Sequence, residues 1–365
     1  MSSKARGLAD LGNVYDDGAL SNRNLIINGA MQVAQRGTSA SAPSDGSFLL
    51  DRFNIFRNGA GVVDVSQSSV APDGFRNSLL LSVSTADTSL GSSDSGGLRY
   101  VVEGYDTAQI GFGTANAKQI TLSFYARSNV VGTYSVSFRN SAANRYYTAN
   151  YTIDSADTWE QKSITITADT SGTWVTDNGK GIDLRFCLWE GGFSASPDTW
   201  GDGNIIGANN TTTSWIASTN NTFYITGVQL EVGDTATPFE HRSYGDELLA
   251  CKRYFQRIAG GESGITGSAI MTGIMHNSTF LEGIYKMEVE MRTEPTLERV
   301  AGTDYYGFSR NGAQDTFNSI SIDAGIGNPR QVNLYNATEV SGTAGQGGIM
   351  FSKVEAAIVS LSAEL

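Results

Sequence analysis

The sequence predicts an all-β protein: a jelly-roll β-sandwich, then a short linking helix and a second, smaller β-sandwich domain. The chain has 365 residues, which is enough for two or three domains, and it contains 42 Gly but only 6 Pro. Charged residues make up 17% of it, against about 25% in an average soluble domain. Short segments that alternate apolar and polar residues recur between turn signals, which is typical of sandwiches and jelly rolls.

The jelly-roll domain is expected over residues 24–245. Its clearest strand is 119–127, where Ile120, Leu122 and Phe124 alternate with polar residues, so that one face is buried and the other is wet. Similar runs predict further strands at 47–56, 77–84, 132–139, 145–153, 158–166 and 183–189.

Segments 24–38 and 221–245 are expected to contain the opening and closing strands of this domain. The first contains the turn signals Asn28-Gly29 and Arg36-Gly37. The second alternates apolar residues on both sides of Gly227. We therefore expect the two segments to complete one sandwich, although about two hundred residues separate them.

Residues 246–261 are predicted to form the linking helix. Ser243 and Asp246 have the spacing of a capping box, and apolar residues follow at helical spacing over 246–258. Gly260-Gly261 ends this run. Residues 262–365 then form the second β-domain, with alternation at 284–291, 318–323 and 355–365, the last predicting a strand that runs to the final residue.

Charge and hydropathy exclude several classes of partner. The formal net charge is −12 and no run of Lys or Arg is present, which argues against a nucleic-acid partner. The first 25 residues lack the apolar segment of a signal peptide, and no apolar run is long enough for membrane insertion. Synthesis in a cytoplasm without export is therefore expected.

Cys187 and Cys251 have neither a disulfide-framework pattern nor the spacing of metal ligands. Two buried, reduced thiols are the favoured interpretation, and a single long-range bridge stays open. The loop 198–204 is rich in Asp and Gly, but Asn209 stands where an EF-hand needs a carboxylate. A structural calcium stays open as well, and no metal ligands or cofactors are predicted.

No catalytic residues are predicted. Ser93-Asp-Ser-Gly-Gly97 is similar to the nucleophile segment of serine proteases, but a triad needs a His base. His241 and His276 both follow the serine, whereas the base precedes it in that family. A Gly/Ser turn that enters a strand explains the segment, and the chain is predicted not to be an enzyme.

Several motifs occur in an order and spacing that resemble a family of phage and prophage virion proteins. They are Asp51-Arg-Phe53, Leu122-Ser-Phe-Tyr-Ala-Arg-Ser128, Thr133-Tyr-Ser-Val136, Asp157-Thr-Trp-Glu-Gln-Lys-Ser-Ile-Thr165 and Phe223-Tyr-Ile-Thr-Gly-Val-Gln-Leu-Glu231. The family comprises tail-fibre-like and head-fibre-like structural proteins with a jelly roll similar to carbohydrate-binding modules. The resemblance covers roughly 24–258.

This resemblance implies a virion protein, assembled in the host cytoplasm and homotrimeric. The function it favours is that of a tail fibre that attaches to a host-surface glycan. A head fibre or capsid decoration protein is the alternative, and the sequence does not decide between tail and capsid. A glycan depolymerase is a third interpretation, for which no carboxylate pair can be named.

Residues 1–23 are too poor in apolar side chains to fold alone. They are either a disordered terminus or a peptide that orders when it docks onto another virion protein, and the second reading is preferred. The residues expected to make this contact are Leu8, Leu11, Val14 and Tyr15.

Aromatic side chains are the candidates for glycan contact, because sugars stack their C–H faces on aromatic rings. Trp200 and Trp215 lie in loops rich in Gly, Asn and Thr, so we expect them to be exposed and to bind glycan. Trp159 and Trp189 lie in predicted strands and are expected in the core, since aromatic residues dominate burial.

Overall fold

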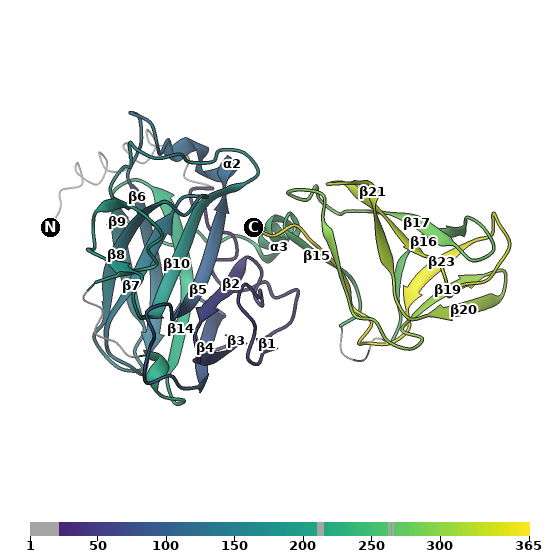
Figure 1. Cartoon of the computed structure of the whole chain (residues 1–365), viewed down its shortest axis with the longest axis horizontal. Helices are drawn as coiled ribbons and strands as arrows, with labels where there is room; N and C mark the ends of the chain where they lie inside the picture. The colour runs from purple at the N-terminus through teal and green to yellow at the C-terminus, as the bar shows by residue number, and fades with distance from the viewer. Residues whose placement is uncertain (1–21, 210–214, 262–263, 265) are drawn as a thin grey trace. The chain divides into compact units, whose positions relative to one another are not determined.

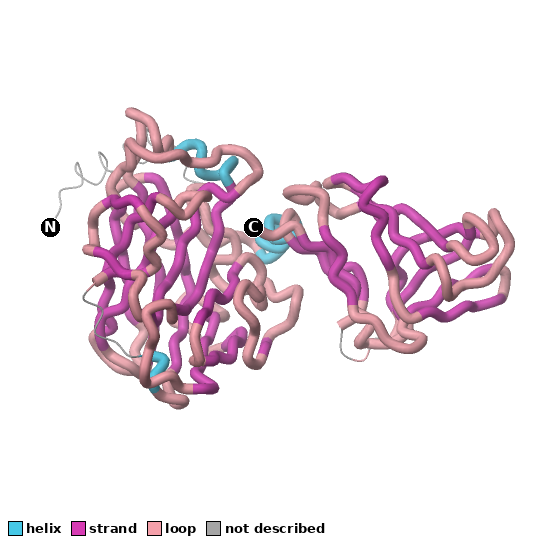
Figure 2. The backbone as a smooth tube through the Cα atoms, in the orientation of Figure 1, coloured by secondary structure: helices cyan, strands magenta, loops and turns pink. Residues whose placement is uncertain are grey.

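The computed structural model describes residues 22–209, 215–261, 264 and 266–365. The chain divides into two compact units. Unit 1 runs to Glu247 and includes Leu365, and unit 2 is Leu248–Glu364. Strands and loops make up nearly all of both, as Figure 2 shows, so the protein is all-β. In the described part of the chain, no helix has the length and hydropathy needed to cross a membrane.

Unit 1 is a sandwich whose described residues form two antiparallel six-stranded sheets (Figure 1). Sheet A has the order β1 (Ser39–Ala40), β3 (Val62–Ser68), β4 (Ser78–Thr85), β14 (Thr222–Val232), β6 (Ile120–Ser128), β9 (Glu160–Ile166). Sheet B has the order β12 (Trp200–Asp202), β8 (Arg145–Ile153), β7 (Gly132–Arg139), β10 (Lys180–Glu190), β5 (Ser95–Glu103), β2 (Phe53–Asn58).

Smaller elements complete unit 1. The short strands β11 (Ser194–Ala195) and β13 (Gly207–Ala208) pair in parallel. Both lie in the connection that follows β10. The helical elements are α2 (Gly104–Thr107), η1 (Ala108–Ile110), η2 (Trp215–Ala217) and the first part of α3 (Tyr244–Lys252), which crosses the boundary between the units.

The core of unit 1 lies between the inner faces of its two sheets. In β6 the side chains of Ile120, Leu122 and Phe124 are fully buried, as their alternation predicts. The ring of Phe124 makes an edge-to-face contact with the ring of Phe186 in sheet B, with 5.1 Å between the ring centroids. The predicted strands at 132–139 and 145–153 are confirmed residue for residue as β7 and β8.

The opening segment is not a strand, and this corrects the expectation for 24–38. It runs as turns and extended backbone because Asn28 and Met31 have positive φ angles of 62° and 55°. It nevertheless bonds to the closing strand. Asn24 Oδ1 accepts the backbone N–H of Leu230 at 3.1 Å, and Leu25 N–H donates to the Leu230 carbonyl at 2.8 Å.

A β-bulge at Gly227 shapes β14. The pairing register with β6 shifts between Thr226 and Gln229, and Gly227 takes a left-handed φ of 62°. The extra residue resets the alternation, so Ile225 and Val228 both point inward and are fully buried. The alternation around Gly227 is therefore confirmed, and its physical cause is the bulge.

The linking helix is shorter than predicted. One bond of the predicted capping box is present, since Asp246 N–H donates to Ser243 Oγ at 3.2 Å, whereas the Asp246 carboxylate accepts from the Ser243 hydroxyl at 2.7 Å. However, α3 ends at Lys252, and 255–259 form strand β15 instead of the predicted helix. The reason is that this segment pairs with β24, and sheet pairing overrides the helical spacing.

Unit 2 is a smaller sandwich, and its described residues form a three-stranded and a seven-stranded sheet around one core. The first has the order β15 (Phe255–Ala259), β24 (Val359–Ser362), β18 (Thr296–Arg299). The second has the order β20 (Ala313–Phe317), β19 (Tyr306–Arg310), β23 (Gly347–Ser352), β16 (Ser268–Met275), β17 (Leu281–Lys286), β22 (Gln331–Asn336), β21 (Ser321–Asn328).

The last strand of the chain is shorter than predicted. β24 ends at Ser362 and does not reach the final residue. It lies between β15 and β18 and is paired on both sides, so it is not an edge strand that a neighbouring protomer would have to cover. The predicted strand 284–291 also ends early, because β17 stops at Lys286.

Replacing Gly227 tests the bulge. A Cβ at this position would lie 2.7 Å from the Phe75 ring, in addition to the strain of a left-handed φ. We expect Gly227→Ala to lower the free energy of unfolding by about 1–3 kcal/mol, measured by urea denaturation. Gly46→Ala is the matched control, because Gly46 also has a positive φ of 78° but open space around it. An equal loss in both variants would contradict a packing role for Gly227.

Candidate functional site

Trp215 is not exposed, and the expectation for this residue is wrong. Its side chain is fully buried in η2 and stacks on Trp189, with ring centroids 6.0 Å apart and an interplanar angle of 18°. Trp189 in turn lies against Gly96, where a Cβ would come within 1.9 Å of the indole. The bare glycine backbone thus makes room for a pair of indoles inside the sandwich, so Trp215 cannot contact a glycan.

Trp200 is partly exposed, but its ring is already surrounded. Its Nε1–H donates to the Thr167 carbonyl at 2.8 Å. Phe112 and Trp174 meet the ring edge to face at centroid distances of 5.4 and 5.6 Å. The guanidinium of Arg145 lies 5.6 Å from the ring centroid. These contacts make Trp200 part of a packed edge of sheet B and not an open stacking platform.

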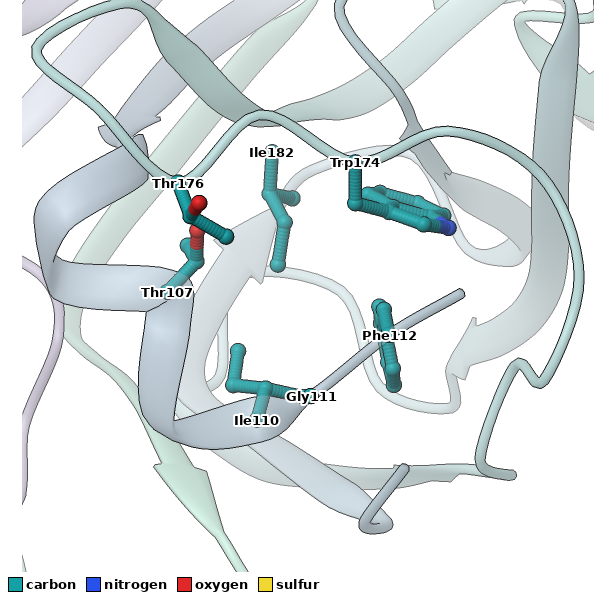
Figure 3. A pocket seen from close by; sticks show the side chains of 7 residues that line it. All are labelled: Thr107, Ile110, Gly111, Phe112, Trp174, Thr176 and Ile182. Carbon is teal, nitrogen blue, oxygen red and sulfur yellow. The ribbon is translucent and has the colours of Figure 1, made fainter. Parts of the chain in front are cut away.

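A small cavity lies beside this cluster, and Figure 3 shows Trp174 and Phe112 at its rim. It is lined by Thr107, Ile110, Gly111, Phe112, Trp174, Thr176 and Ile182. Its volume is about 10 Å³, which is room for about one water molecule. The cavity is therefore too small for a sugar ring.

Trp159 is partly exposed, although a core position was expected. It lies just before β9 on the outer face of sheet A, where its ring is 6.1 Å from that of Tyr224. The strand register explains this neighbourhood, because Tyr224 pairs with Arg127, and Trp159 follows in line beyond the last pair of β6 and β9. One row of outward side chains thus crosses three strands of sheet A.

Arg127 holds this row in place. Its guanidinium lies 4.9 Å from the Tyr224 ring centroid, within the range of a cation–π contact. Its Nε donates to the Asp157 carbonyl at 2.8 Å, and its terminal nitrogen pairs with the Asp157 carboxylate at 3.0 Å. Because Asp157 neutralises this charge, the row offers aromatic surface without a net positive charge.

A second group of rings continues the same face. Tyr125 lies next to Phe75 at 5.4 Å between centroids, and Phe75 meets Phe239 at 5.0 Å and His241 at 5.1 Å. The Phe75 ring packs directly against the backbone of β14 because Gly227 has no side chain there. All of these rings are partly or fully exposed.

We define the aromatic surface as these two groups together, Phe75, Tyr125, Arg127, Trp159, Tyr224, Phe239 and His241. A large exposed patch of apolar side chains on a protein surface usually marks a site of interaction with another molecule. The sequence held a signal for it, since Tyr125 and Tyr224 occupy the polar, outward positions of their strands, where large aromatic side chains are not needed for folding.

Other predicted sites can be placed in part. The residues expected to attach to a virion, Leu8, Leu11, Val14 and Tyr15, lie outside the described residues. Cys187 and Cys251 are both buried and form no disulfide in the described structure. Burial raises the pKa of Cys187 to about 12, which leaves it an inert thiol at neutral pH.

In the loop 198–204, where a structural calcium stayed open, one of the two acids is already paired. Asp202 pairs with Arg145 at 3.1 Å. Within the described ranges, no group of three or more His, Cys, Asp or Glu side chains is placed to hold a metal ion.

Comparison with known proteins gives only distant likenesses. No family model matches the chain, and no curated protein matches it. Similar solved structures include the enzymatically active domain of tailspike protein 4 of bacteriophage CBA120, at 14% identity and a TM-score of 0.30 over 53% of this chain and 21% of that chain.

Two carbohydrate-binding modules are also similar. A family 11 module of a Clostridium thermocellum cellulase aligns at 13% identity and a TM-score of 0.28, over 56% of this chain and 98% of that chain. The xylan-binding CBM22-2 domain of Paenibacillus barcinonensis Xyn10C aligns at 14% and 0.27, over 49% of this chain and 91% of that chain. At these scores the likeness carries no conclusion about the ligand of this chain.

Replacing Trp215 should destabilise the protein far more than replacing Trp159. We expect Trp215→Ala to lower the free energy of unfolding by about 3–5 kcal/mol, because it empties a core position. Trp159→Ala should cost about 1 kcal/mol or less, since the ring has one aromatic neighbour and is partly exposed. Urea denaturation of the full chain measures both. Similar losses in the two variants would contradict this placement.

Proposed function

We propose that this chain is a fibre protein of a phage virion that holds a host-surface glycan against the aromatic surface of sheet A. The observation that carries the glycan assignment is that two groups of partly exposed rings, Trp159 with Tyr224 and Tyr125 with Phe75, Phe239 and His241, lie on the outer face of sheet A. The fibre assignment is supported by the sequence motifs quoted above, whose order is that of virion structural proteins.

Recognition would use ring stacking more than charge. The flat faces of the aromatic side chains match the C–H faces of pyranose rings. The exposed Gln161, which pairs with Tyr125 in register, can orient sugar hydroxyls. Because Arg127 is neutralised by Asp157, a sugar without charge suits this surface. The rings are held by strand backbone and by one another, so little ordering entropy opposes binding.

A single site of this kind binds weakly, and the proposed homotrimer supplies avidity by presenting several copies to one surface. Residues 1–23 are proposed to attach the fibre to the particle through Leu8, Leu11, Val14 and Tyr15. Imaging the intact virion distinguishes the two positions: density for this chain on tail appendages supports host attachment, whereas density on the capsid lattice would make it a head fibre or decoration protein.

Removing the ring of Trp159 or of Tyr224 should weaken glycan retention. We expect Trp159→Ala and Tyr224→Ala to weaken binding to host-surface polysaccharide about tenfold each, measured by affinity electrophoresis. Tyr105→Ala is the matched control, because Tyr105 is 60% exposed in α2 and has no place in the aromatic surface. Undiminished retention in both ring variants, with folding verified by circular dichroism, would rule out this surface as the binding site.

A further inference from the structure

The outer face of sheet B carries a cluster of arginines. The register places Asp183 opposite Arg139, and Arg185 opposite Arg99, on neighbouring rungs of β5, β10 and β7. All four side chains are at outward positions of the sheet, on the face opposite the core of unit 1. Lys180 lies at the start of the same central strand, β10.

One carboxylate serves all three arginines. Asp183 Oδ1 accepts from Arg99 Nε at 2.9 Å, and Asp183 Oδ2 accepts from Arg139 at 2.7 Å. Arg185 reaches both oxygens, at 3.3 and 3.4 Å. In the described part of the chain, the two terminal nitrogens of Arg99 and one of Arg185 donate to no protein atom. Arg139 also donates to Asn204 Oδ1, but the donors of the three arginines still outnumber these acceptors.

The positive charge is concentrated where solvent is partly excluded. Arg99 and Arg185 keep 18% and 15% of their side-chain surface exposed, while Arg139 keeps 4% and Asp183 keeps 1%. Glu103, which pairs with Lys180 in register, adds a second carboxylate, so four cationic side chains stand near two acidic ones. This excess contrasts with the net charge of −12 of the chain.

The pKa values agree with an uncompensated charge. Burial lowers the pKa of Arg185, Asp183 restores it in part, and Arg139 and Arg99 lower it further. Burial also lowers the pKa of Lys180, against the pull of Asp183, and the three arginines add to the lowering. For Asp183, burial acts to raise the pKa, but the arginines outweigh it and hold the pKa below its usual range.

Buried polar atoms without partners surround the cluster. Arg139 Nε has no hydrogen-bond partner among the described residues, and neither do Ser137 Oγ and Asn54 Oδ1. Ser137 pairs in register with Arg185, and Asn54 pairs with Arg99, so both lie on the same rung as the arginines. An unsatisfied buried polar atom is destabilising, so these three atoms show that hydrogen-bond donors and acceptors are not balanced around the cluster.

From this arrangement we propose that the arginine cluster of sheet B is a second binding site, which takes the carboxylate group of an acidic saccharide such as a hexuronic acid. A guanidinium presents two parallel N–H donors that match a carboxylate, and Arg99 is placed to do this at the edge of the cluster. The buried Phe56 ring supports Arg185 from behind, because the Arg185 guanidinium lies 4.7 Å from its centroid.

This site lies on the other sheet and does not depend on the aromatic surface. The two proposals therefore fail separately: loss of neutral-glycan binding would leave the arginine site standing, and absence of acidic-sugar binding would leave the aromatic surface standing.

The test is calorimetric titration of the full chain at constant ionic strength with sodium D-glucuronate, D-glucose and sodium phosphate. We expect glucuronate to bind at sheet B and Arg99→Gln to weaken this binding about tenfold, the loss expected for a charged hydrogen-bonded pair. Arg330→Gln is the control, because it removes the same charge from an arginine 78% exposed in unit 2. It should bind glucuronate as the unaltered chain does.

Nuclear magnetic resonance of the unaltered chain keeps the test independent of how Arg99→Gln folds. Glucuronate should shift the Nε–H signals of Arg99 and Arg185, and glucose should not. Phosphate binding without glucuronate binding would overturn the saccharide assignment and leave a site for small inorganic anions. If no probe binds, or if Arg99→Gln binds glucuronate unchanged, the arginine cluster is not a ligand site.

Discussion

The bulge at Gly227 is the constraint on which unit 1 depends. β14 lies between β4 and β6 in sheet A, and the bulge sets free the backbone groups of Val228. Its N–H donates to the Gly29 carbonyl at 3.0 Å, and its carbonyl accepts from Asn24 Nδ2 at 3.2 Å. One irregular residue thus keeps both halves of β14 in phase with the core, anchors the opening segment and clears the place where Phe75 lies.

The outer faces of the two sheets of unit 1 have opposite chemical character. Sheet A presents neutral rings, in which the charge of Arg127 is matched by Asp157. Sheet B presents guanidinium groups that share Asp183. A sandwich permits this division because alternate residues of each strand leave the core free to hold the fold while the outward positions vary.

The sequence predicted the strands far better than the exposure of single side chains. Period-two alternation located β6, β7 and β8, because burial of one face imposes that pattern directly. It could not place Trp215, whose Gly-, Asn- and Thr-rich surroundings suggested a loop, because the stacking on Trp189 depends on Gly96 in a distant strand. The helical spacing of apolar residues after Lys252 gave a wrong prediction for the same reason. Pairing with β24, which is distant in sequence, makes residues 255–259 a strand. The aromatic surface arises from register between strands, which one sequence does not reveal.

The place of β14 in sheet A has a consequence for how the protein is made. Its neighbours β4 and β6 lie about 140 and 100 residues earlier in the chain, and they do not pair with each other. Until the ribosome has released β14, sheet A has a gap at its centre, and the hydrogen-bond partners of Asn24 in β14 have not yet been made. Pairing over such separations carries a large loop-closure entropy and slows folding. The exposed edges of β4 and β6 must therefore be kept from pairing with other chains until β14 has been made. Unit 1 then closes in one late step when β14 inserts between them.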